Sequence, residues 1–164
     1  MAPNNIPLSE FDHEMAVTRK VLSRIPENKF GWAPHVKSMT LGRLATHLAE
    51  IPGWVKETLT LDGIDMGGDY KPEVLTTREQ VVAKFDRMVA VARPLIESAT
   101  DAQLSAPWTL KSDGQVMLTM PRFAVLRGFV LSHLIHHRAQ MTVYLRLNDV
   151  PVPSIYGPSA DEAS

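Results

Sequence analysis

The segment from Phe123 to Leu147 constrains the fold of this chain more than any other stretch, because it is long, largely apolar and lacks proline. Its apolar residues recur every three or four positions, the periodicity of an α-helix with one buried face. Pro121 is tolerated in the first turn of a helix, and the run from Asn148 to Pro151 ends one. We therefore expect one long helix from near Pro121 to about Leu147.

Three earlier segments show the same periodicity and predict three more helices. These run from Leu8 to Ile25, from Thr40 to about Leu61 and from about Thr77 to Ser98. The second contains Pro52, and a proline inside a helix removes a backbone hydrogen bond and bends the axis. The third begins with Thr76-Thr77 followed by Glu79-Gln80, which is typical of a helix cap.

The remaining segments are less regular. Asp113-Gly114 separates two short apolar runs, which indicates a β-hairpin. Residues 62–72 are expected to form a loop, and residues 152–164 an extended tail that frays at its end. A chain of 164 residues suffices for one domain with one core. The sequence thus predicts an all-α fold, a four-helix bundle spanning residues 1–164 as a single domain, with a small β-hairpin before the last helix.

Charge and composition exclude several classes of protein. The formal net charge is −1, so nothing favours a nucleic-acid partner or an anionic membrane surface. No apolar stretch reaches the roughly 18 to 20 residues that cross a bilayer, and residues 1–5 lack the basic start and apolar run of a signal peptide. Cysteine is absent, which rules out disulfides and cysteine-ligated metals within the chain and favours a cytoplasmic location.

The predicted fourth helix carries the strongest candidate for chemistry, because three of the six histidines fall within five residues. His133 and His137 are four residues apart and therefore lie on one face of a helix. Two imidazoles at that spacing can bind one divalent metal ion. No glutamate follows His133, so the metalloprotease signature is absent. The alternative is that both are ordinary histidines with hydrogen-bonded partners.

A stable metal site needs a third ligand, and His47 is the strongest candidate. It lies in an apolar helical pattern, where an ionisable side chain is costly to bury without a partner. His136 competes with His137, since it lies three residues after His133, but the apolar stripe favours the side that carries His137. Three neutral histidines suit zinc, nickel, ferrous iron or copper and leave a coordination position for water or substrate.

Residues around such a site would orient the imidazole rings. Glu50, Gln140 and Tyr144 are candidates by position, although solvation or packing is the default interpretation of each. Arg122 and Arg127 near the start of the fourth helix are candidates for binding an anionic substrate, against the default of solvated surface arginines.

Four stretches of the sequence match the motifs of a known family. They are residues 39–49 (MTLGRLATHLA), 133–140 (HLIHHRAQ), 144–153 (YLRLNDVPVP) and the dipeptide Tyr156-Gly157. Together they resemble the DinB-like family of DNA-damage-inducible and related proteins, and the resemblance covers most of the chain. One departure is Ala139, where the family often has glycine.

The resemblance implies a four-helix bundle of up-down-down-up type and a divalent metal bound by three histidines, which correspond here to His47, His133 and His137. It also implies a homodimer, since members often form one. Relatives include transferases that use the thiols bacillithiol or mycothiol, and a mycothiol-dependent isomerase. In these the open metal position would activate the thiol of the cosubstrate.

The leading hypothesis is a cytoplasmic DinB-like protein that binds zinc, nickel or iron and acts on a small-molecule substrate. The metal would activate a low-molecular-weight thiol or a water molecule, for thiol S-transfer or hydrolysis. The alternative is a non-enzymatic, stress-related or structural dimeric bundle, with a structural metal or none. An open fourth coordination position favours the enzyme, and a closed one favours the structural site.

Overall fold

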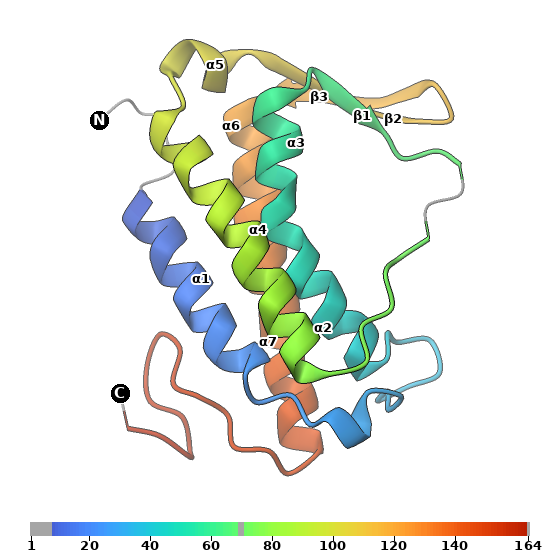
Figure 1. Ribbon diagram of the computed structural model, residues 1–164, viewed down its shortest axis with the longest axis vertical. Coiled ribbons are helices and arrows are strands. Elements are labelled where there is room, and N and C mark those ends of the chain that lie inside the picture. The colour runs from blue at the N-terminus through green and yellow to red at the C-terminus, as the bar shows by residue number, and fades with distance from the viewer. Residues whose placement is uncertain (1–7, 69–70, 164) are drawn as a thin grey trace.

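The computed structural model describes residues 8–68 and 71–163, which are mostly helical with a small three-stranded sheet at one end (Figure 1). Residues 1–7, which bear on the signal-peptide expectation, lie outside the described residues. The helices are α1 (Leu8–Leu22), α2 (Leu41–Glu50), α3 (Trp54–Thr60), α4 (Arg78–Ser98), α5 (Asp101–Ser105), α6 (Arg122–Val125) and α7 (His133–Leu147). Shorter helical segments are η1 (Glu27–Lys29), η2 (Ile51–Gly53) and the π-helical η3 (Leu126–Ser132). The strands are β1 (Gly63–Asp65), β2 (Pro107–Ser112) and β3 (Gln115–Pro121).

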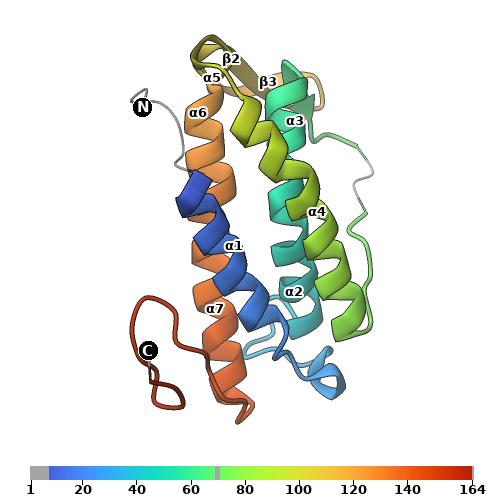
Figure 2. The same ribbon diagram turned by 60° about the vertical axis from the view of Figure 1, so that its left-hand side comes forward.

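The long helical segments lie side by side along the longest axis of the molecule (Figures 1 and 2). In the view of Figure 1 the chain descends through α1, ascends through α2 and α3, ascends again through α4 and descends through α6, η3 and α7. Helices α1 and α2 each pack against both α4 and α7. Their apolar faces meet in one core, which includes Phe11, Leu44, Phe85, Leu134 and Met141. Among the described residues, no helix combines the length and apolar composition that crossing a bilayer requires.

Two of the predicted helices are not single uniform α-helices, so the count of four helices is not confirmed. The second is interrupted by η2 around Pro52, as expected from the backbone hydrogen bond that proline cannot make. The fourth is continuous but changes its hydrogen-bonding pattern from α to π over η3. The first ends at Leu22, three residues before the expected Ile25.

The predicted cap of α4 is confirmed in detail. The Thr77 hydroxyl accepts a hydrogen bond from the Gln80 backbone N–H, and the Gln80 side chain accepts one from the Thr77 backbone N–H, both at 3.2 Å. This reciprocal arrangement satisfies backbone donors that have no partner inside the helix. It fixes where α4 begins, directly after the segment that covers α2.

The predicted hairpin is also confirmed, but the sheet is larger than expected. Strands β2 and β3 are antiparallel and are joined by Asp113 and Gly114, both with positive φ (50° and 77°), the requirement of the tight turns that suit hairpins. The prediction of a loop over residues 62–72 is wrong in part, because β1 lies within this range and pairs in parallel with β2. A Cβ at Gly63 would lie 2.1 Å from the Thr109 carbonyl oxygen, so this pairing needs glycine there. An all-α description is therefore incomplete.

The expectation of a frayed tail is wrong as far as Glu162. The Asp161 carboxylate accepts hydrogen bonds from the Arg146 side chain and from the Val152 backbone N–H. The Glu162 carboxylate pairs with Arg24 of the segment that follows α1. Hydrogen bonds and ion pairs therefore hold the tail against α7 and against the segment that follows α1.

Candidate metal centre

His47, His133 and His137 come together between α2 and α7, although 86 residues separate the first two. The Nε2 atom of His133 lies 3.1 Å from that of His47 and 2.8 Å from that of His137. One ligand atom from each of the three side chains lies within 4.8 Å of the other two. In tetrahedral coordination with metal–nitrogen bonds of about 2.0–2.1 Å, two ligand nitrogens are roughly 3.3 Å apart. The observed spacing is therefore close to that of a three-histidine metal site.

The two helices present these side chains because of how each packs. On α2, Leu44 and Leu48 are buried in the core, and His47 lies beside them at the edge that faces α7. On α7, His133 directly follows the π-helical η3, and His137 lies one turn later. The backbone N–H of His133 donates to the carbonyls of Gly128 and Val130 and not to that of Phe129.

The hydrogen bonds of the Nδ1 atoms fix how His133 and His137 are protonated. The Nδ1 atom of His133 lies 3.3 Å from the Phe129 carbonyl oxygen, which can only accept, so this nitrogen carries the proton of the neutral ring. The Nδ1 atom of His137 lies 2.7 Å from the Gln140 side-chain oxygen and is a donor for the same reason. Both Nε2 atoms then carry lone pairs that face each other at 2.8 Å. A metal ion held by these residues would convert this repulsion into ligation.

Burial keeps these rings in the neutral form that binds metal. It lowers the pKa of His137 to about 4, with smaller contributions from the neighbouring histidines. Burial also lowers the pKa of His133, followed in size by the effect of His47. At neutral pH neither ring needs to lose a proton before it binds a metal ion.

Behind His47 lies a group of charged side chains, of which only Glu50 was a candidate from the sequence. The Glu50 carboxylate is 3.9 Å from the Nδ1 atom of His47 and accepts hydrogen bonds from Arg43 and Lys84, each at 3.4 Å. Lys84 also pairs with Glu73 from the segment that precedes α4. Burial raises the pKa of Glu50, but His47, Lys84 and Arg43 together outweigh it and leave the pKa below its usual value. A carboxylate near the outer nitrogen of a ligand histidine orients the ring and raises its basicity.

The other candidate residues have mixed outcomes. Gln140 contacts a ligand ring, whereas the Tyr144 hydroxyl donates to the Met39 carbonyl and supports packing. His136 is exposed and lies outside the group of three histidines. Arg122 donates to Asp62 and to the Leu59 carbonyl, and Arg127 pairs with Glu10, so both have partners within the chain.

Position alone suggested Glu50 and Gln140, but solvation or packing was the default interpretation of both. The roles of Lys84, Arg43 and the Phe129 carbonyl had no local signal, because they depend on the approach of other segments or on the π-helical backbone.

Comparisons with known proteins identify the family of this chain. The model of the DinB family matches residues 1–164. The chain is 28% identical over 156 residues to the uncharacterized protein YrdA of Bacillus subtilis, covering 94% of this chain and 89% of that protein.

Two crystal structures share the fold. A DinB-like protein from Bacillus cereus has a TM-score of 0.70 at 23% identity, over 91% of this chain and 95% of the other. The DinB-like protein YjoA from Bacillus subtilis has a TM-score of 0.68 at 17% identity, over 90% and 95%. With a family model that matches its whole length, this chain belongs to the DinB family.

Proposed function

We propose that this protein binds one divalent metal ion through His47, His133 and His137 and uses it to activate a small thiol or a water molecule. The observation that carries the proposal is that the Nε2 atom of His133 lies 2.8 Å from that of His137 and 3.1 Å from that of His47. The Nδ1 contacts of His133 and His137 leave the lone pairs of their Nε2 atoms free to bind a metal ion. The scaffold we propose is a single-domain four-helix bundle of up-down-down-up type.

A metal ion bound here would lower the pKa of a coordinated thiol or water and so provide a nucleophile near neutral pH. The protein's own contribution is to keep the His133 and His137 rings neutral and to position all three rings. The Phe129 carbonyl and the Gln140 side-chain oxygen accept hydrogen bonds from the Nδ1–H groups of His133 and His137, and the Glu50 carboxylate lies 3.9 Å from the Nδ1 atom of His47.

An enzymatic role is favoured over a structural one by the number of ligands. The group that could hold a metal ion among the described residues has three members, and three protein ligands would leave a position for an exogenous molecule. Thiol S-transfer and hydrolysis are the reactions that fit such a position. Zinc, nickel and iron all suit three imidazoles. A homodimer and a cytoplasmic location stay predictions.

Cobalt substitution tests the open position directly. The Co²⁺-loaded protein is titrated with 2-mercaptoethanol, and ethylene glycol serves as the matched control without sulfur. A sulfur-to-cobalt charge-transfer band that appears with the thiol alone is the expected result. An unchanged visible spectrum with a fully loaded site would favour a closed, structural metal and contradict thiol activation.

A further inference from the structure

A second site lies on the outward side of α2, where residues 73–76 cross its first turns. The cavity has a volume of about 320 Å³, at the lower end of the range of small-molecule sites. It is lined by Phe30, Thr40, Gly42, Arg43, Thr46, Glu73, Val74, Leu75 and Thr76. None of the three clustered histidines lines it, so it is distinct from the metal centre.

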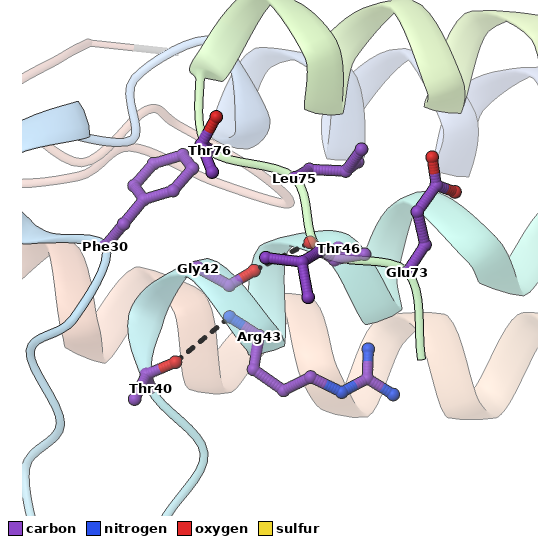
Figure 3. A pocket seen from close by; sticks show the side chains of 9 residues that line it. Phe30, Thr40, Gly42, Arg43, Thr46, Glu73, Leu75 and Thr76 are labelled. Atoms are coloured by element: carbon purple, nitrogen blue, oxygen red, sulfur yellow. Dashed lines mark hydrogen bonds between the residues drawn. The ribbon is translucent and has the colours of Figure 1, made fainter. Parts of the chain in front are cut away.

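The pocket has a charged end and an apolar end. Figure 3 shows Arg43 and Glu73 toward one end, Phe30 and Thr76 toward the other, and Leu75 between them. Its exposed lining is mostly apolar. Such a pocket fits a molecule with a polar head and a short apolar body.

Most polar groups in the lining already have partners within the chain. The Thr40 hydroxyl accepts from the Arg43 backbone N–H, and the Thr46 hydroxyl donates to the Gly42 carbonyl. The charge of Glu73 is compensated by Lys84. The hydroxyl groups and Glu73 therefore have less capacity for a ligand than their number suggests.

Arg43 is the exception. Among the contacts of the described residues, its guanidinium makes one hydrogen bond, to Glu50 at 3.4 Å. A guanidinium carries five N–H donors in a planar fork that matches the two oxygens of a carboxylate. Its side chain is 29% exposed, so a bound anion would be partly shielded from water.

We propose that this pocket binds a small organic carboxylate whose carboxyl group pairs with Arg43 and whose apolar body lies against Leu75 and Phe30. Arg43 is the residue that selects the acid over a neutral analogue. The proposal does not depend on a metal ion.

The test uses the full-length ¹⁵N-labelled protein, titrated by NMR with hexanoate, hexan-1-ol, hexylammonium and inorganic phosphate. Saturable shifts around residues 40–46 and 73–76 with hexanoate are expected, at an affinity at least about tenfold above that of each other probe, the size of one charge-assisted hydrogen bond. The titration is repeated after EDTA treatment, and the hexanoate shifts persist. Their loss would mean that hexanoate binds a metal ion instead, and would overturn the proposal without touching the proposed function.

Variants then assign the recognition to Arg43. Arg43→Met removes the preference for hexanoate over hexan-1-ol. The control is Arg93→Met, which removes a guanidinium that pairs with Asp12 and does not line the pocket. This control variant keeps the preference. Because Arg43→Met also removes a partner of Glu50, Leu75→Ala is a second variant. It weakens both probes and keeps the preference. Equal binding of acid and alcohol to the unmodified protein, tighter binding of hexylammonium or phosphate, or full hexanoate affinity in Arg43→Met would each overturn the proposal.

Discussion

A buried ion pair between Glu14 and Arg138 joins α1 to α7 one residue after the candidate ligand His137. Arg138 is 1% exposed and Glu14 is 5% exposed, and the Nη1–Oε2 distance is 2.6 Å. The Tyr156 hydroxyl from the tail accepts from Arg138 at 2.6 Å and donates to Glu14 at 2.8 Å. Glu14→Gln keeps the shape of this group but leaves the Arg138 charge without its counter-ion.

The expected cost follows from burial. Removing one partner of a buried pair destabilises a protein by about 3–5 kcal/mol, because the remaining charge stays out of water. Domains of this size are stable by about 5–15 kcal/mol. At about 2–4 °C per kcal/mol, the Tm falls by roughly 6 to 20 °C. Tyr156→Phe removes a hydroxyl and no charge, so it costs less, about 1–3 kcal/mol.

Urea unfolding followed by circular dichroism measures these differences. Asp86→Asn is the matched control, since it breaks an ion pair with Arg19 in which both side chains are about half exposed, and it should cost at most about 1 kcal/mol. The double variant Glu14→Leu with Arg138→Met removes both charges and should be more stable than Glu14→Gln alone. A Glu14→Gln protein as stable as the Asp86→Asn control would refute the reasoning.

Two further predictions concern the metal centre. Lys84→Met removes a partner of Glu50 behind His47 and should weaken zinc binding about tenfold in a competitive chelator titration. The control Lys56→Met, on the exposed side of α3, should bind zinc as tightly as the unmodified protein. Equal zinc affinities of the two variants would contradict a role of Lys84 at the metal centre. For the metal-free protein, the unfolded chain gains a proton on His137 below its ordinary pKa of 6.5, whereas the folded chain keeps this ring neutral down to about 4. This group's contribution to stability is therefore lost as pH falls from about 6.5 to 4, by at most about 3 kcal/mol. The urea midpoint should change less between pH 7 and pH 5 in His137→Gln than in the unmodified protein. An equal change in both proteins would contradict the lowered pKa of His137.

The sequence predicted those parts of the fold that local chemistry determines. Thr77 and Gln80 form the expected cap, and Asp113-Gly114 forms the expected turn, because both depend on residues a few positions apart. The spacing of His133 and His137 predicted a shared face for the same reason. His47 could be added from its apolar surroundings and from the family resemblance, but the pairing of α2 with α7 that brings it close depends on the whole fold.

The missed features depend on contacts between distant segments. Strand β1 has three residues and pairs with β2, 46 positions later, so it has no periodicity of its own. Lys84, which also pairs with Glu73, reaches Glu50 only after α4 packs on α2. The tail is ordered by Arg24 and Arg146, whose partners lie in the tail itself. The composition of the tail predicts fraying because it contains no information about these ion pairs with distant residues.

The central claim is that three histidines hold one metal ion, and metal content tests it most directly. Protein purified without a histidine tag, loaded with zinc, nickel or iron and desalted, is measured by elemental analysis beside His47→Ala, His133→Ala and His137→Ala, with the exposed His136→Ala as the control. The account predicts near one equivalent in the unmodified protein and the control and a sharp loss in each of the three variants. Unchanged stoichiometric metal in all three, or no metal in the unmodified protein after loading, would contradict it.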